Sequence, residues 1–378
     1  MVDKTKSLTV PALMVEGADQ CADLFYGSGF MPVDPVVFLD AGQHRTLVVP
    51  MLEFGRAREE AKGVEVVLPD DIKIPKKRGR SISHWALALL RREGIRRVRV
   101  GSFFPAGVMK VLERNGVKVV VEKGSLYPGR AVKHADEVEK ISDSQRAAVS
   151  AMRRARVILA EAVAGADGRL RWQGSVLDSE RLRTEIDIEL LRKGCHARDT
   201  IVAGGAQAAD PHERGHGPLR AGESIVIDIF PRHKRSGYWG DITRTFCKGK
   251  PLPALARMYK AVLEAQQLAL DMIKPGMRAD KVHQAVCDYF DERGYETTVK
   301  DGVVRGFFHG TGHGVGLDIH EAPSISRIEH VFRAGEVVTV EPGLYDPDIG
   351  GVRIEDTVVV EKSGARILSA FPKKFGIG

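Results

Sequence analysis

A stretch of eight residues occurs twice in this chain with little change. AGESIVID covers residues 221–228 and AGEVVTVE covers residues 334–341. Each copy begins Ala-Gly-Glu, continues through apolar, mostly β-branched residues, and ends in an acid, Asp228 or Glu341. The apolar run predicts a buried strand, whereas the acid interrupts that pattern. The repeat therefore predicts an internal duplication in which two related strands each carry a carboxylate.

A second acid follows each copy at nearly the same distance. Asp241 comes 13 residues after Asp228, and Glu355 comes 14 residues after Glu341. Pro and Gly lie between the acids of each pair, which predicts that each segment turns back as a hairpin. Pseudo-two-fold symmetry then brings all four carboxylates together. One such acid alone is typical of a solvated strand end, but the matched placement of four favours a functional site.

A segment rich in histidine and glycine lies between the two hairpins. HGTGHGVGLDIHE, residues 309–321, contains His309, His313 and His320, interleaved with Gly310, Gly312, Gly314 and Gly316. Glycine at these places predicts close approach of the backbone to a ligand and positive φ angles. Four buried carboxylates require protons or cations, because they repel one another and lose hydration. Carboxylates combined with imidazole favour Mn, Co, Fe or Zn.

The length of 378 residues predicts two domains. Residues 1–130 alternate short, Val-rich strands with helices that end at Gly or Asn-Gly, which predicts an α/β domain. Residues 131–378 begin with a long helix and then twice repeat helices followed by a hairpin, which predicts an α+β domain. The long helix has a predicted buried face made of Val138, Ile141, Ala148, Met152, Ala155 and Leu159.

Composition argues against several classes of protein. No apolar run is long enough to span a bilayer, and the N-terminal residues lack a signal-peptide pattern, so a cytoplasmic protein is expected. The four cysteines form no paired motif. The net charge is +7, with basic runs at 75–80, 91–99 and 231–235. Only Trp85 lies near the first two runs, which favours a solvated basic surface over nucleic-acid binding.

Four motifs together resemble the metal-site motifs of the pita-bread metallopeptidases, which include Xaa-Pro aminopeptidases, prolidases and methionine aminopeptidases. They are GYWGDITRTF (237–246), HGTGHGVGLDIHE (309–321), VEPGLY (340–345) and GGVRIEDTV (350–358). The resemblance covers about residues 130–378. Residues 1–130 resemble the N-terminal domain of creatinase and prolidase through LFYGSGF (24–30). That domain argues against a methionine aminopeptidase, and the complete set of metal ligands argues against creatinase.

The resemblance implies two divalent metal ions, with Mn favoured over Co, Zn or Fe. It implies five metal ligands, Asp228, Asp241, His313, Glu341 and Glu355, of which Asp241 and Glu355 bridge the two ions. A hydroxide between the ions attacks the peptide carbon, with Glu341 as general base. The resemblance also implies active-site roles for His212, His309, His320 and Arg353. His216 competes with His212, and Thr243 is expected to support the ligands.

The resemblance further implies peptide substrates with proline at the second position, and a homodimer. Some prolidases carry Arg at the position of Ser324, which suits the free carboxylate of a dipeptide. Its absence favours an Xaa-Pro aminopeptidase over the alternative, an Xaa-Pro dipeptidase, although Arg327 could replace it. The segment between Asp228 and Asp241 is longer than in typical members. A remote alternative is a non-catalytic binding module on the same fold.

Overall fold

The computed structural model describes residues 10–16, 21–72, 74 and 81–377. The basic run at 75–80 lies outside the described residues. The chain divides into two compact units, Met1–Pro128 and Gly129–Gly378. None of the helices in the described ranges has the length and apolar character needed to cross a bilayer.

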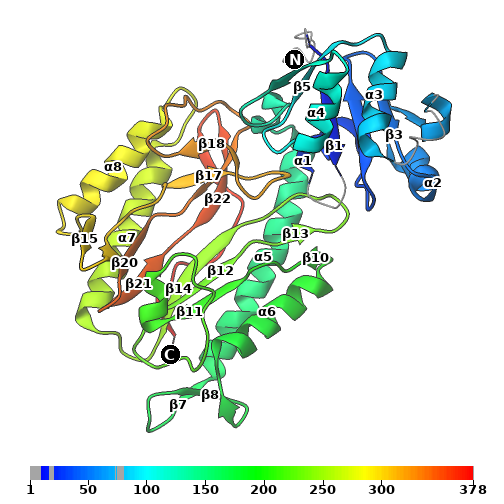
Figure 1. Ribbon diagram of the computed structural model, residues 1–378. Coiled ribbons are helices and arrows are strands. Elements are labelled where there is room, and N and C mark those ends of the chain that lie inside the picture. Colours follow the sequence, from blue (N-terminus) through cyan, green and yellow to red (C-terminus); the bar gives the residue numbers. More distant parts are fainter. Residues whose placement is uncertain (1–9, 17–20, 73, 75–80, 378) are drawn as a thin grey trace. The chain divides into compact units, whose positions relative to one another are not determined.

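The first unit is built on a six-stranded sheet with the order β4-β3-β2-β1-β5-β6 (Figure 1). Its strands are β1 (Ala12–Glu16), β2 (Val36–Asp40), β3 (Arg45–Val48), β4 (Glu65–Val67), β5 (Arg97–Val100) and β6 (Lys118–Val121). Strand β1 pairs antiparallel with β2 and parallel with β5. The helices are α1 (Ala22–Ser28), α2 (Met51–Glu60), α3 (Ile82–Arg92) and α4 (Ala106–Arg114). The predicted alternation of strands and helices is confirmed, although β1 and α1 were not predicted.

The second unit contains two main sheets, each covered by a pair of helices (Figure 1). Helices α5 (Ala135–Glu161) and α6 (Ser179–Arg192) share a core with β12 (Ile225–Ile229) and β14 (Ile242–Lys248). Helices α7 (Pro253–Met272) and α8 (Ala279–Asp291) share a core with β19 (Val337–Val340) and β22 (Asp356–Glu361). The remaining strands of the two sheets are β11 (Ile201–Gly204), β24 (Gly376–Ile377), β17 (Gly312–Gly314), β18 (Glu321–Ile325) and β23 (Gly364–Ile367).

Short strands complete the second unit. They are β7 (Val163–Ala164), β8 (Leu170–Trp172), β9 (Ser175–Val176), β10 (Cys195–His196), β13 (Arg232–His233), β15 (Thr298–Lys300), β16 (Val303–Arg305), β20 (Gly343–Asp346) and β21 (Gly350–Arg353). Two of them, β20 and β21, pair with each other and bring the chain back towards β22. β13 lies in the segment that joins β12 to β14.

The two Ala-Gly-Glu phrases open equivalent hairpins. Gly222 has φ +82° and Gly335 has φ +93°, conformations in which glycine is favoured. The Gly222 amide donates to the Lys248 carbonyl at 2.8 Å, and the Gly335 amide donates to the Val360 carbonyl at 2.8 Å. β12 then pairs antiparallel with β14, and β19 pairs antiparallel with β22. The same backbone contact therefore sets the start of both hairpins.

Helix α5 follows the predicted buried face with one exception. Every predicted residue is buried except Val138, which is half-buried. Glu137 turns inward instead, because one of its oxygens accepts from the His134 amide at 2.8 Å and the other from the Tyr238 hydroxyl at 2.7 Å. This cap fixes the first turn of the helix.

A buried ion pair joins the two sheets. Arg244 on β14 donates to Asp356 on β22 at 2.7 Å, and each residue is 1% exposed. The same guanidinium donates to the carbonyl of Phe371 at 2.7 Å. Lys373 also contacts Asp356, at 2.7 Å. Because its charges are buried and hydrogen-bonded, this pair holds together the strands that flank Asp241 and Glu355.

We expect Arg244→Met to lower the free energy of unfolding by about 3 kcal/mol, because the substitution leaves Asp356 buried with fewer partners. The matched control is Arg366→Met, which removes an exposed ion pair with Glu361 and should cost less than about 1 kcal/mol. Urea unfolding of the metal-free protein measures both changes. Equal losses in the two variants would show that the buried pair does not hold the sheets together.

Candidate metal centre

The four predicted carboxylates lie where the two central hairpins meet. Asp228 is on β12, and Asp241 directly precedes β14. Glu341 directly follows β19, and Glu355 directly precedes β22. In the first hairpin Asp228 lies opposite Thr243, and in the second Val340 lies opposite Asp356. The two halves therefore contribute their acids from equivalent strands.

Hydrogen bonds between the hairpins hold these acids side by side. The Glu355 amide donates to the Thr243 carbonyl at 3.0 Å, and the Thr243 hydroxyl donates to Glu355 Oε2 at 2.8 Å. The backbone carbonyl of Asp241 accepts from the Thr357 hydroxyl at 2.8 Å and from Gln145 Nε2, on α5, at 2.9 Å. Thr243 thus occupies the supporting position that the sequence predicted.

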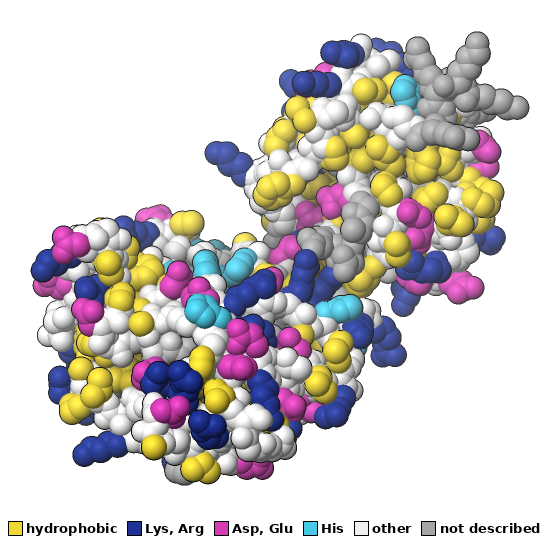
Figure 2. All heavy atoms as spheres, turned by 60° about the horizontal axis from the view of Figure 1, so that its bottom comes forward, with side chains coloured by type: hydrophobic (Ala, Val, Ile, Leu, Met, Phe, Trp, Pro, Cys, Tyr) yellow, Lys and Arg dark blue, Asp and Glu magenta, His cyan; other side chains and the backbone are white. Residues whose placement is uncertain are grey.

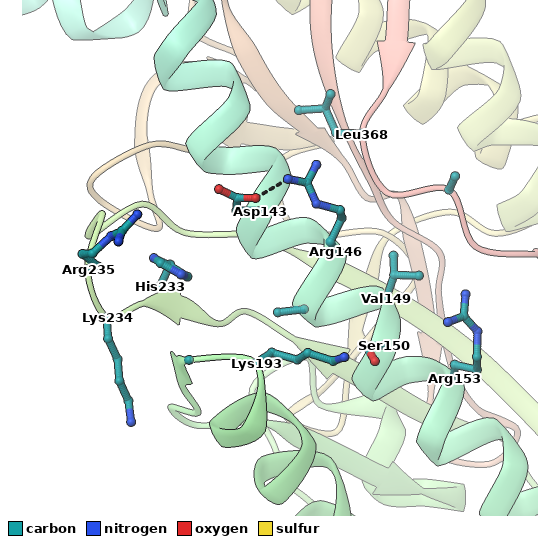
Figure 3. A pocket seen from close by; sticks show the side chains of 13 residues that line it. Asp143, Arg146, Val149, Ser150, Arg153, Lys193, His233, Lys234, Arg235 and Leu368 are labelled. Carbon is teal, nitrogen blue, oxygen red and sulfur yellow. Dashed lines mark hydrogen bonds and ion pairs between the residues drawn. The ribbon is translucent and has the colours of Figure 1, made fainter.

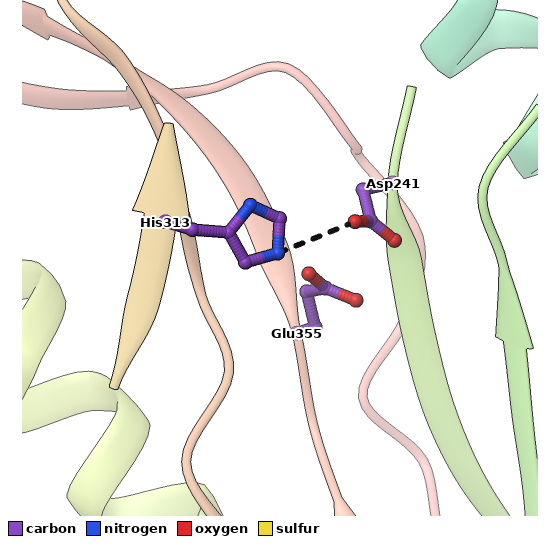
Figure 4. Close-up of side chains that lie close together, drawn as sticks. All are labelled: Asp241, His313 and Glu355. Carbon is purple, nitrogen blue, oxygen red and sulfur yellow. Dashed lines mark ion pairs between the residues drawn. The ribbon is translucent and has the colours of Figure 1, made fainter. Parts of the chain in front are cut away.

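His313 completes the cluster from the second sheet. Its Nε2 lies 3.7 Å from Asp241 Oδ2 and 3.3 Å from Glu341 Oε1. Its Nδ1 lies 3.2 Å from the Gly314 carbonyl, which can only accept, so Nδ1 carries the proton. The Nε2 lone pair is therefore directed at the acids. Ligand atoms of Asp241, His313 and Glu355 all lie within 4.8 Å of one another (Figure 4).

Without a cation, the surroundings of this cluster strongly disfavour the ionised form of its carboxylates. Burial raises the pKa of Asp241 well above its ordinary value, and the neighbouring Glu355 and Asp228 raise it further. Burial likewise raises the pKa of Glu355, and it raises that of Glu341 to about 7. Burial lowers the pKa of His313, which favours the neutral imidazole. Protons or cations must therefore balance the acids.

Two buried oxygens of the cluster point to a cation. Within the described residues, Asp228 Oδ1 and Glu355 Oε1 are buried without a hydrogen-bond partner. Buried carboxylate oxygens rarely remain unpaired, because each loses hydration without compensation. Four carboxylates and one neutral imidazole form a donor set that suits Mn, Co, Fe or Zn. The five predicted ligands therefore fit a divalent cation.

Arg353 connects the cluster to His309 through Tyr345. Arg353 Nη2 donates to Asp228 Oδ2 at 2.8 Å, and Nη1 donates to the Tyr345 hydroxyl at 3.2 Å. That hydroxyl lies 2.8 Å from His309 Nε2. The Gly310 carbonyl, 2.8 Å from His309 Nδ1, requires a proton on Nδ1, so Nε2 accepts from Tyr345. Burial, with the charge of Arg353, lowers the pKa of His309 to about 3.

The remaining histidines lie in two different places. The His320 ring packs edge-on against His313, with ring centroids 4.3 Å apart. His212 lies close enough to His309 and His320 for its charge to lower the pKa of both. His216 instead lies near Glu180, whose pKa it lowers. These electrostatic effects favour His212 over its competitor His216 as the histidine nearer the cluster. Figure 2 shows histidine and acidic side chains together on one face of the second unit.

The glycines of the 309–321 segment act differently from the prediction. Positive φ angles were expected, but Gly310, Gly312, Gly314 and Gly316 have none. A Cβ on Gly312 would lie 2.0 Å from the Thr339 carbonyl oxygen, and one on Gly314 would lie 2.5 Å from that of Ala322. These glycines are needed because neighbouring strands pass too close for a side chain.

Sequence reasoning missed a second group of functional candidates beside His320. Glu321 is flanked by Arg130 and by Lys133, whose Nζ lies 2.8 Å from Glu321 Oε1. Arg130 also donates to Asp318 at 2.8 Å, and its side chain is 6% exposed. The Asp318 amide donates back to Glu321. These contacts fix the backbone on both sides of His320. Their signal in the sequence is weak, because Arg130 and Lys133 lie far from the motifs.

Residues 139–362 match metallopeptidase family M24. This chain belongs to metallopeptidase family M24. The match spans both hairpins and all five predicted ligands. Family membership implies a divalent-metal cofactor, in agreement with the donor set described above.

Three comparisons place the M24 chain among its relatives. It is 31% identical over 349 residues to the Xaa-Pro dipeptidase of Pyrococcus horikoshii, covering 92% of this chain and 90% of the relative. The solved prolidase of Pyrococcus horikoshii superposes with a TM-score of 0.80 at 29% identity, covering 97% and 95% of the two chains. The Xaa-Pro dipeptidase of Bacillus anthracis gives 0.82 at 25% identity, with coverage of 97% and 95%. The predicted pita-bread fold with an N-terminal domain is confirmed.

The raised pKa values predict that metal binding releases protons. In the metal-free M24 protein, the raised pKa values of Asp241, Glu341 and Glu355 favour their protonated forms, from which a cation must displace protons, so apparent affinity should rise with pH. Calorimetric titration with Mn²⁺ at about pH 6 and about pH 8, in buffers of different ionisation enthalpy, measures the release. More protons should be released at the lower pH. Release that is absent at both pH values would contradict the assigned cluster.

The Lys133–Glu321 contact predicts a positioning effect on His320. We expect Lys133→Met to lower kcat by about tenfold while Mn²⁺ affinity stays unchanged, because the ligands themselves are untouched. Lys133→Arg should recover part of the rate. The matched control, Lys140→Met, removes an exposed ion pair with Asp136 and should leave both quantities unchanged. A parallel loss of metal affinity in Lys133→Met would rule out a role confined to His320.

Proposed function

We propose that this M24 chain is a metal-dependent Xaa-Pro dipeptidase, which hydrolyses a dipeptide with a C-terminal proline to two amino acids. The observation that carries the proposal is the convergence of five metal-compatible side chains on one buried point. It is supported by the similarity to a relative called Xaa-Pro dipeptidase, which covers 92% of this chain and 90% of the relative. This relative favours the dipeptidase alternative over the aminopeptidase that the sequence analysis preferred. A homodimer and a cytoplasmic location remain predictions.

Two divalent cations would be held by the five ligands Asp228, Asp241, His313, Glu341 and Glu355, the set that the family resemblance implies. When bound, the cations supply Lewis acidity, which makes a water more acidic and a peptide carbonyl more electrophilic. Mn is the favoured metal, with Co, Zn and Fe as alternatives.

Glu341 is the proposed general base. Its side chain is 17% exposed, and its Oε1 accepts from the Thr339 hydroxyl at 3.2 Å. A carboxylate held at the reacting centre can take a proton from the attacking water and later return it. The hydrogen bond from Thr339 holds Oε1 in place.

His320 is the proposed donor to the substrate. In the described part of the chain no group hydrogen-bonds its ring, so an N–H is free to stabilise the oxyanion or to protonate the prolyl nitrogen. A secondary amine needs a proton in order to leave. His309 has no such N–H, because Gly310 and Tyr345 occupy both nitrogens. We therefore propose that His309 and Tyr345 orient Arg353. His212 is proposed to contact the substrate.

Recognition of a dipeptide requires a cation for its free carboxylate. Ser324 lies opposite His313 in the β17–β18 ladder, close to the metal centre. Its hydroxyl donates to Ser326 at 2.9 Å. Arg327, two residues past the end of β18, is exposed and is the nearest cation along this strand. Arg327 is therefore the proposed partner of the carboxylate.

Hydrolysis of Ala-Pro and Ala-Pro-Ala by the Mn²⁺-loaded protein tests the proposal. We expect a higher kcat/KM for Ala-Pro, loss of activity on metal removal, and recovery on return of Mn²⁺. Glu341→Gln should lower kcat by about 10²–10⁴. The matched control is Glu361→Gln, an exposed acid at the end of β22, which should retain full activity.

Three other results of this assay would each support a different function. Faster cleavage of Ala-Pro-Ala would favour the aminopeptidase. Bound metal without turnover would point to a different amide substrate. Absence of both metal and turnover would favour the non-catalytic binding module.

A further inference from the structure

A basin in the second unit shares no lining residue with the metal centre. It has a volume of about 890 Å³ and lies between α5, the end of α6 and the segment around β13 (Figure 3). Sites for small organic ligands have volumes of roughly 300–1,000 Å³. The basin is therefore large enough for a molecule of nucleotide size.

Positive charge dominates the lining of the basin. Five side chains with permanent charge and one imidazole face it: Arg146, Arg153, Lys193, Lys234, Arg235 and His233. The one carboxylate in the lining, Asp143, is paired with Arg146. Among the described residues, no carboxylate lies within ion-pair distance of Arg153, Lys234 or Arg235. Three cations thus remain available to an anion.

The basin is built from ordered backbone. On α5, residues 143, 146, 147, 150 and 153 follow the spacing of one helix face. Opposite them, β13 pairs with β10, His233 facing Cys195. The Lys234 amide donates to the Gly194 carbonyl at 3.0 Å, which ties the β13 segment to the end of α6. The cations therefore project from elements that are joined to one another.

Four apolar residues also line the basin, Ala147 and Val149 on α5 and Leu368 and Ala370 near the C-terminus. A lining that combines apolar and cationic side chains suits an organic molecule that carries charged groups at one end. No Phe, Tyr or Trp lines the basin, so it lacks the stacking surfaces that bind single-stranded nucleic acid.

We propose that this basin binds a small organic polyphosphate. Several free cations favour a multiply charged ligand, and guanidinium groups match phosphate oxygens in geometry. The ligand would contact the segment that joins Asp228 to Asp241, since Arg235 lies between these two residues. Binding at the basin does not require the peptidase reaction, so it is tested by affinity and not by activity.

Calorimetric titration of the full-length protein with ATP and with tripolyphosphate tests the site, the second probe lacking an organic part. The variant Arg153→Ala/Lys234→Ala/Arg235→Ala removes the three free cations. The control Arg257→Ala/Lys274→Ala/Lys281→Ala removes the same net charge from exposed positions on and between α7 and α8. Chelation of bound metal by the probes affects both variants equally. All six side chains are exposed, so both variants should fold, which thermal unfolding checks.

We expect saturable binding of ATP that weakens by about tenfold or more in the basin variant and by less than about twofold in the control. Binding of ATP should be tighter than that of tripolyphosphate, because the apolar side chains of the lining can contact the organic part. Equal weakening in both variants, or no saturable binding to the wild type, would overturn the proposal. So would binding of a single-stranded oligonucleotide that exceeds that of ATP and depends on the same three cations.

Discussion

Repulsion among four carboxylates, two of them buried and two half-buried, is the constraint on which the second unit depends. Removing such groups from water is costly unless each finds a partner of opposite charge or a hydrogen-bond donor. The fold supplies some of this compensation through Arg353 on Asp228 and Thr243 on Glu355. Two buried acid oxygens in the described chain, Asp228 Oδ1 and Glu355 Oε1, still have no hydrogen-bond partner. The ionised form of this site is stable only when cations are bound. Folding and metal binding are therefore linked.

The internal duplication builds that site from two similar halves. Each half supplies two acids from one hairpin, and its helices bury the other side of the strands. The Arg244–Asp356 pair and the bonds from Thr243 to Glu355 then lock the halves together. Because these contacts come from residues adjacent to the ligands, a shift of either sheet would move the ligands directly.

Most of the metal centre was predictable from the sequence, because its four acids recur at matched spacing in two halves and His313 lies in a motif that resembles those of the metallopeptidases. The roles of the histidines were not. Hydrogen bonds from Gly310 and Tyr345 occupy both nitrogens of His309, while His320 retains a free ring. Sequence spacing carries no information on such bonds. Nor did it reveal β1, a short apolar strand at the centre of the first sheet, whose residues also suit a helix.

The sequence by itself predicted the duplication, the two-unit plan and the four matched acids, because strand periodicity and turn residues are local properties. His313 was assigned as the fifth ligand only through the family resemblance. Only the tertiary structure decided which polar groups support these ligands. It brought Arg130 and Lys133 to Glu321 and turned Glu137 inward in place of Val138. It also gathered the basin cations from α5, from the residue after α6 and from the segment around β13. These contacts join residues distant in the chain, and the packing of helices on sheets creates them.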